Sequence, residues 1–166
     1  SNRFSLEAVG AFYEGVWIVC ADFKLDLVGG DLSSSRAGLV LSVSVLGRVS
    51  KQAITYRHTA QLNDILCVSG DLGAAYLGLT LLEREKQVFL ADPSMQPKLE
   101  GKEYVVQRQL RPEARMDVVY ELAEAGVVPT AMIDLSDGLA SDLMHLCTQS
   151  KVGAVVFEEH LPIEDA

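Results

Sequence analysis

Two aspartates and a serine stand together in the segment Asp134-Leu135-Ser136-Asp137-Gly138. The run before it, residues 127–133, is mostly apolar, and an apolar helical pattern follows from Leu139. This order predicts a buried strand, a tight turn and a helix start. Two carboxylates at such a turn can hold one Mg²⁺ ion, and free N–H groups at the helix N-terminus can hold an anion. The segment therefore points to a magnesium–nucleotide site. The alternative is that Ser136 or Asp137 only caps the helix.

Two more acidic turns follow apolar runs. Residues 25–28 lead into Gly29-Gly30-Asp31, and residues 65–68 lead into Ser69-Gly70-Asp71-Leu72-Gly73. Glycine lets a backbone approach a ligand closely or adopt positive φ. Gly-Asp is also ordinary turn chemistry, so each turn is weak evidence alone. Because the same arrangement occurs three times in one short chain, a shared acidic site is favoured.

Five stretches, taken in order, are shared with a known family: Gly29-Gly30-Asp31; Thr55-Tyr56-Arg57 with Asn63-Asp64; Gly70-Asp71-Leu72-Gly73; Leu110-Arg111-Pro112; and residues 133–143. On these stretches the chain resembles the thiamine-monophosphate kinases, from about Leu6 to Pro162. Their superfamily includes aminoimidazole ribonucleotide synthetase and selenophosphate synthetase. The Ile-Asp-Leu-Ser-Asp-Gly-Leu phrase, with Gly-Asp-Leu-Gly upstream, is specific to the kinases, whereas Gly-Gly-Asp is not.

The resemblance implies ATP-dependent phosphorylation of thiamine monophosphate to thiamine diphosphate, with Mg²⁺. It implies that Asp31, Asp134 and Asp137 bind the metal. It also implies that the nucleotide is contacted by Gly30, Asp31, Arg57 and Ser136, and it assigns no catalytic side chain. Leu32 departs from the family, which usually has threonine there, so a hydroxyl contact after Asp31 is not expected. We expect Asp31, Asp134 and Asp137 to lie near one another without lysine or arginine partners.

The length of the relatives bears on what this chain does alone. Family members look about twice as long as this chain, a size more typical of two domains. The resemblance therefore implies an internal fragment lacking both ends, inactive by itself and derived from a homodimeric enzyme. Two alternatives stay open: an ATP-dependent synthetase of the aminoimidazole ribonucleotide or selenophosphate type, and a non-catalytic dimerisation module.

The expected fold is α/β (α+β), a mixed-sheet fragment of the two-domain aminoimidazole ribonucleotide synthetase-like fold. We place residues 1–52 in the N-terminal, ATP-binding and dimerisation domain, and residues 53–166 in the C-terminal α/β domain. Apolar alternation and turn residues predict strands at 26–28, 39–49, 65–69, 130–133 and 153–157. Helical spacing predicts helices at 5–23, 73–86, 101–110, 115–125 and 139–149.

Composition excludes several classes of function. The 166 residues carry a formal net charge of −9, which opposes nonspecific nucleic-acid binding because that needs Lys and Arg in excess. We expect no membrane contact, because no apolar run approaches the length of a membrane-spanning helix. Three widely spaced cysteines, Cys20, Cys67 and Cys147, read as reduced thiols of a cytoplasmic chain.

Overall fold

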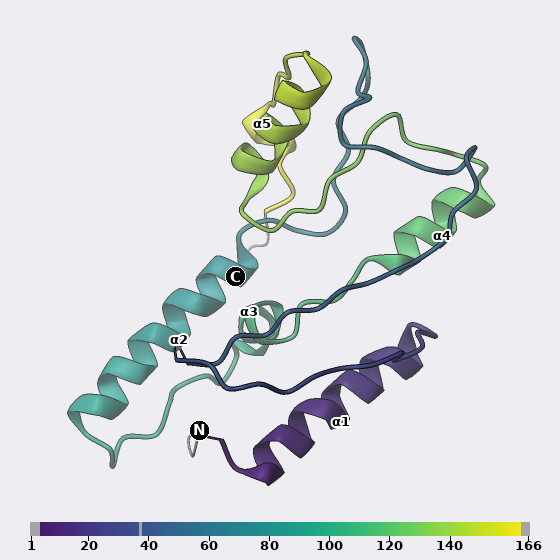
Figure 1. Cartoon of the computed structure of the whole chain (residues 1–166). Helices are drawn as coiled ribbons and strands as arrows, with labels where there is room; N and C mark the ends of the chain where they lie inside the picture. Colours follow the sequence, from purple (N-terminus) through teal and green to yellow (C-terminus); the bar gives the residue numbers. More distant parts are fainter. Residues whose placement is uncertain (1–3, 37, 164–166) are drawn as a thin grey trace. The chain divides into compact units, whose positions relative to one another are not determined.

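The structure is a computed structural model that describes residues 4–36 and 38–163. Its elements, in chain order, are five α-helices and one short 3₁₀ helix: α1 (Leu6–Asp22), α2 (Ala74–Ala91), α3 (Glu103–Leu110), α4 (Met116–Glu124), α5 (Leu139–Ser150) and η1 (Glu158–His160). Figure 1 shows that long segments without regular secondary structure join these helices.

The five predicted helices are confirmed, with small differences at their ends. Helix α1 begins after Ser5, whose side-chain oxygen accepts a hydrogen bond from the Ala8 N–H at 3.2 Å, as an N-cap serine should. Gly126 follows the end of α4 with a φ of +68°, a conformation that glycine adopts without strain. Helix α2 runs five residues beyond its predicted end, from Lys86 to Ala91, because no glycine or proline interrupts it before Pro93.

The α/β mixed-sheet prediction is wrong. Within the residues that the structure describes there is no strand and no sheet, and the architecture is all-α. All five predicted strands, at 26–28, 39–49, 65–69, 130–133 and 153–157, run without a ladder partner. One isolated parallel bridge joins Leu72 to Ile163, and the Leu72 N–H donates to the Pro162 carbonyl at 2.8 Å.

The reason for this error is that strand pairing is not local. A helix satisfies its backbone within its own sequence, whereas a strand needs another segment beside it, about 4.8 Å away. The alternating pattern of residues 39–49 indicates an apolar face but cannot supply the partner. In the structure that face stays open, and Val43 and Val45 are 81% and 75% exposed.

The contacts divide the chain into two compact units, Ser1–Arg48 and Val49–Ala166. In the second unit α2 packs on α3, the one pair of helices in contact among those described. Gly78 of α2 lies directly against the Val105 carbonyl of α3, which lets the two backbones approach closely. Ala74 and Val105 are the two buried apolar residues of the described chain, and both belong to this pair of helices. The packed core that the structure shows is therefore small.

Candidate functional site

The acidic turn that drew attention in the sequence leads directly into α5. Residues 127–135 run without helix, and α5 begins at Leu139 after Gly138 as N-cap. Gly138 has a φ of +116°, where a side chain would be strained. The predicted turn and helix start are therefore confirmed, although the segment before them is not a strand.

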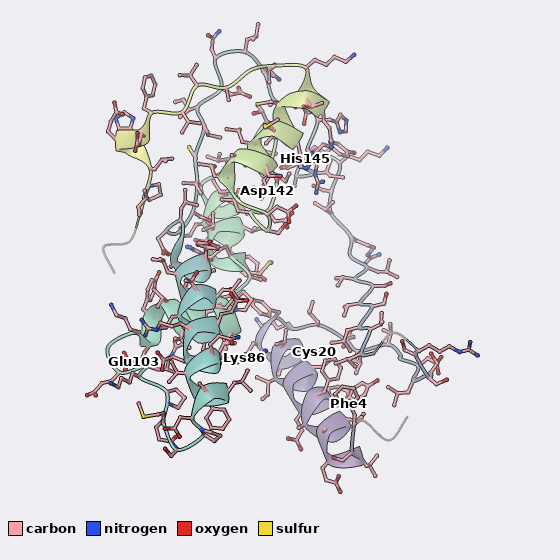
Figure 2. All side chains as sticks on the ribbon, turned by 90° about the vertical axis from the view of Figure 1, so that its left-hand side faces the viewer. Phe4, Cys20, Lys86, Glu103, Asp142 and His145 are labelled. Carbon is pink, nitrogen blue, oxygen red and sulfur yellow. The ribbon has the colours of Figure 1, made fainter. Side chains whose placement is uncertain are left out.

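The turn before α5 is held by a residue that the motif did not single out. One oxygen of the Asp142 carboxylate, Oδ2, accepts hydrogen bonds from three backbone N–H groups: Ser136 at 3.0 Å, Asp137 at 3.2 Å and Gly138 at 3.1 Å. Asp142 is only 3% exposed, and Figure 2 shows it on the first turn of α5. The turn is thus held from inside the helix.

This arrangement rules out the alternative in which Ser136 or Asp137 only caps α5. The side chains of Ser136 and Asp137 make no capping hydrogen bond in the described residues, so they are not the cap of α5. The N–H groups of residues 136–138, which precede the first turn of α5, donate to Asp142. Anion binding by the N–H groups of the helix start itself stays a prediction. The signal in the sequence was an aspartate in the first turn of the predicted helix, where a carboxylate is favoured by the helix dipole.

Arg57 lies beside the turn. Its Nη2 atom is 3.9 Å from Asp134 Oδ1, and the two side chains are 49% and 77% exposed. The expectation that Asp134 has no arginine partner is therefore wrong. An exposed ion pair of this kind contributes about 0–1 kcal/mol to stability, so a bound cation could compete with it.

A hydrogen-bonded segment explains why Arg57 is there. The Met132 N–H donates to the Tyr56 carbonyl at 3.1 Å, and the Thr59 hydroxyl donates to the Thr130 carbonyl at 2.6 Å. The Thr130 hydroxyl in turn donates to Asp64 at 2.6 Å. Residues 56–64 therefore run along residues 130–132, and this contact brings Arg57 to Asp134.

The end of α5 also holds this segment. The Ser150 hydroxyl accepts from the Ala60 N–H at 3.1 Å and donates to the Arg57 carbonyl at 3.4 Å. The two ends of α5 are thus both linked to the candidate site, the first through Asp142 and the last through Ser150.

Gly30 and Asp31 belong to the other unit, Ser1–Arg48. A Cβ atom on Gly30 would lie 3.2 Å from the Tyr13 hydroxyl of α1, so the glycine permits a close approach of chain to helix. Asp31 is exposed. Its proximity to Asp134 and Asp137 stays a prediction.

The third acidic turn has a structural task. Asp71 accepts a hydrogen bond from the Tyr104 hydroxyl at 2.5 Å, and Arg108 Nη2 lies 3.5 Å from the same oxygen. The Tyr104 hydroxyl, together with Arg108, holds the pKa of Asp71 below its ordinary value of 3.8, against the opposing effect of burial. Asp71 therefore anchors the turn before α2 to α3 and does not cap α2, whose N-cap is Gly73.

The donor set at the Asp134 turn suits a hard cation. Carboxylate and hydroxyl oxygens are the ligands that Mg²⁺ prefers, and this ion commonly keeps several waters. No three His, Cys, Asp or Glu side chains come together as a metal site in the parts of the chain that are described. Asp134 and Asp137 are the two carboxylates of the turn that could hold such an ion.

None of the described helices is both long and apolar enough to cross a membrane. The three cysteines are free thiols.

Comparison with known proteins gives a consistent relationship. The thiamine-monophosphate kinase of Bacillus subtilis is 32% identical over 98% of this chain and 47% of its own length. The enzyme of Aquifex aeolicus is 34% identical over 95% of this chain and 46% of its own. That of Synechococcus elongatus is 36% identical over 91% and 44%. No family model and no solved structure matches the chain. By these similarities the chain is related to the thiamine-monophosphate kinases, and it spans under half the length of the curated relatives that it matches.

Proposed function

We propose that this chain contributes part of a magnesium–ATP site to an enzyme that phosphorylates thiamine monophosphate to thiamine diphosphate. The observation that carries the proposal, beside the sequence relationship, is the meeting of Arg57 with Asp134. One is a donor suited to phosphate and the other a carboxylate suited to Mg²⁺. They come from distant parts of the sequence and meet at 3.9 Å.

The proposed roles follow from side-chain chemistry. Asp134 and Asp137 would hold Mg²⁺, and on the family resemblance alone we propose Asp31 as a further metal ligand. Arg57 and the Ser136 hydroxyl would bind phosphate oxygens, with Gly30 allowing close approach of the backbone. When bound, Mg²⁺ neutralises charge that develops during phosphoryl transfer. The acceptor phosphate is already ionised, so the proposal needs no catalytic base among these residues.

Two further proposals concern the surroundings of the enzyme. Three free thiols support a reducing compartment, and we propose a cytoplasmic location. A homodimeric parent enzyme is proposed from the family relationship alone.

Asp137→Asn tests the metal role. We expect Mg²⁺ binding to this chain, measured calorimetrically with ATP present, to weaken at least about tenfold, since outer-shell changes alone reach that size. The melting temperature should change little, because the Asp137 side chain makes no capping bond. Glu159→Gln, an exposed carboxylate change on η1, serves as control. Equal Mg²⁺ affinity in wild type and Asp137→Asn would remove Asp137 from the metal site.

The activity itself needs a separate assay. We expect no thiamine diphosphate from this chain incubated with ATP, Mg²⁺ and thiamine monophosphate, because phosphoryl transfer depends on holding both reactants together. Introducing the change equivalent to Asp137→Asn into a full-length relative should strongly lower the kcat/KM of that enzyme. Turnover by the chain at the rate of a full-length kinase would show that the essential residues lie within it.

A further inference from the structure

The structure shows how Arg57 is held beside the acidic turn. Residues 56–64 run along residues 130–132, and in the part of the chain that the structure describes they form no sheet ladder. One backbone hydrogen bond joins them, from the Met132 N–H to the Tyr56 carbonyl at 3.1 Å. A ladder fixes the register of two segments through a row of such bonds. A single bond leaves the register open, so a second link is needed to set it.

The Thr59 side chain supplies that second link. Its hydroxyl donates to the Thr130 carbonyl at 2.6 Å, and it also lies 3.4 Å from the Tyr56 carbonyl. The first distance is at the short end of the range for an O–H···O bond. Threonine hydroxyls often bond to nearby backbone groups and so close a turn. Here the hydroxyl closes residues 56–59 and also ties them to the segment that leads into Asp134.

Arg57 lies between these two links. The first joins the residue before it, Tyr56, to Met132, and the second joins the residue two positions after it to Thr130. Both partners stand shortly before Asp134 in the chain. The two links therefore fix the backbone of Arg57 at a set place relative to that carboxylate, and the guanidinium meets it at 3.9 Å.

Other side chains hold the same segment farther along. Asp64 accepts from a threonine hydroxyl at 2.6 Å, and Ser150 of α5 accepts from the Ala60 N–H at 3.1 Å. The Ser150 hydroxyl also reaches the Arg57 carbonyl, but at 3.4 Å, which is longer than most O–H···O bonds. These contacts should keep the segment folded when the Thr59 hydroxyl is removed.

We propose that Thr59 is a positioning residue that sets the place of the Arg57 guanidinium relative to the Asp134 carboxylate. This rests on the proposed function, in which Arg57 binds phosphate and Asp134 binds Mg²⁺. Thr59 acts through Arg57 and has no ligand-binding role of its own. Its hydroxyl does for this site what a ladder of backbone hydrogen bonds does between two strands.

The test measures the coupling of Arg57 with Asp134 by NMR, on the whole chain and without Mg²⁺ or nucleotide. The guanidinium N–H signal of Arg57, assigned by its loss in Arg57→Lys, should shift when Asp134→Asn is introduced. In a Thr59→Val background that response should fall about twofold or more, because the hydrogen bond that holds the turn is lost. In Thr59→Ser, which keeps the hydroxyl, the full response should return.

Thr55→Val is the matched control. Thr55 also lies two residues from Arg57, on the other side, and its hydroxyl makes no hydrogen bond within the described residues. This variant should leave the response to Asp134→Asn unchanged. An undiminished response in a folded Thr59→Val chain, or no response in the wild-type chain, would overturn the proposal.

The wild-type chain decides the matter if Thr59→Val does not fold. A hydroxyl held by the Thr130 carbonyl fixes the χ1 angle of Thr59, so its three-bond couplings should report a single rotamer. Couplings averaged over several rotamers would overturn the proposal. None of these measurements uses Mg²⁺ or nucleotide, so failure of Mg²⁺ binding alone would count against the proposed function and not against this role of Thr59.

Discussion

Asp64 shows how one side chain organises the segment that carries Arg57. Its Oδ2 atom accepts from the Thr130 hydroxyl at 2.6 Å and from the Gln61 N–H at 2.7 Å. The Thr130 hydroxyl, and then the Gln61 N–H, hold the pKa of Asp64 below its ordinary value of 3.8. A carboxyl whose pKa is lower in the folded state stabilises the fold above its unfolded pKa, and that contribution is lost as the pH falls through the folded value.

Thr130→Val should therefore raise the pKa of Asp64 toward 3.8. The stability of the variant should then fall less than that of the wild type as the pH drops below about 4. The side-chain carboxyl signal of Asp64, followed by ¹³C NMR across the acid range, measures the shift. Thr80→Val is the matched control, because the Thr80 hydroxyl donates to a helical carbonyl, that of Tyr76. An unchanged Asp64 titration in Thr130→Val would show that this hydrogen bond does not form in solution.

At the level of elements, the contact of α2 with α3 depends on the absence of one side chain. A Cβ atom on Gly78 would lie 2.0 Å from the Val105 carbonyl oxygen and 3.0 Å from the Gln109 Cβ atom. No real contact is that short, so α3 would have to move away. Because Ala74 and Val105 are buried at this pair of helices, the movement would expose the packed core.

Gly78→Ala should destabilise the Val49–Ala166 unit by about 1–3 kcal/mol, the usual cost of overpacking, although alanine is by itself the better helix former. Denaturant unfolding measures the change. Gly15→Ala in α1 is the control, because nothing lies within 4 Å of the added Cβ there, and it should preserve or raise helicity. A Gly78→Ala chain as stable as wild type would mean that α2 and α3 do not pack this closely.

For the whole molecule, the outstanding property is how much apolar surface stays open. Val28, Leu46 and Ile65 are 92%, 93% and 88% exposed, and each lies in a segment with a strand-like pattern and no partner. A large exposed apolar patch marks a site where another molecule binds. Few apolar residues are buried within the described residues of either unit. We therefore expect the exposed apolar surface to be buried when chains associate.

We expect the chain to self-associate with rising concentration, and light scattering after size-exclusion chromatography measures this. Val45→Lys together with Val43→Lys should shift the equilibrium toward monomer, because two charges on the apolar face of the 39–49 segment oppose burial. Ser44→Lys and Ser42→Lys, on the polar positions of the same segment, form the control pair. A chain that stays monomeric at all concentrations would contradict the expectation.

The sequence by itself determined what depends on neighbouring residues. Helix hydrogen bonds join residues four apart, and capping groups act within one turn. The five helices could therefore be predicted, with Ser5 at the start of α1 and Gly126 after α4. The position of the Asp134–Gly138 turn before α5 was predictable for the same reason. The family relationship also rests on residues that can be read in order along the chain.

Only the tertiary structure decided what depends on distant segments. Strand pairing needs a second segment beside the first, and the alternating pattern of residues 39–49 could not show that none lies there. The pairing of Arg57 with Asp134 depends on the contact of residues 56–64 with 130–132. The task of Asp142 depends on how the turn folds back over the first turn of α5, which brings three N–H groups to one oxygen. The sequence shows which groups are present, whereas the folded structure decides which of them lie close enough to interact.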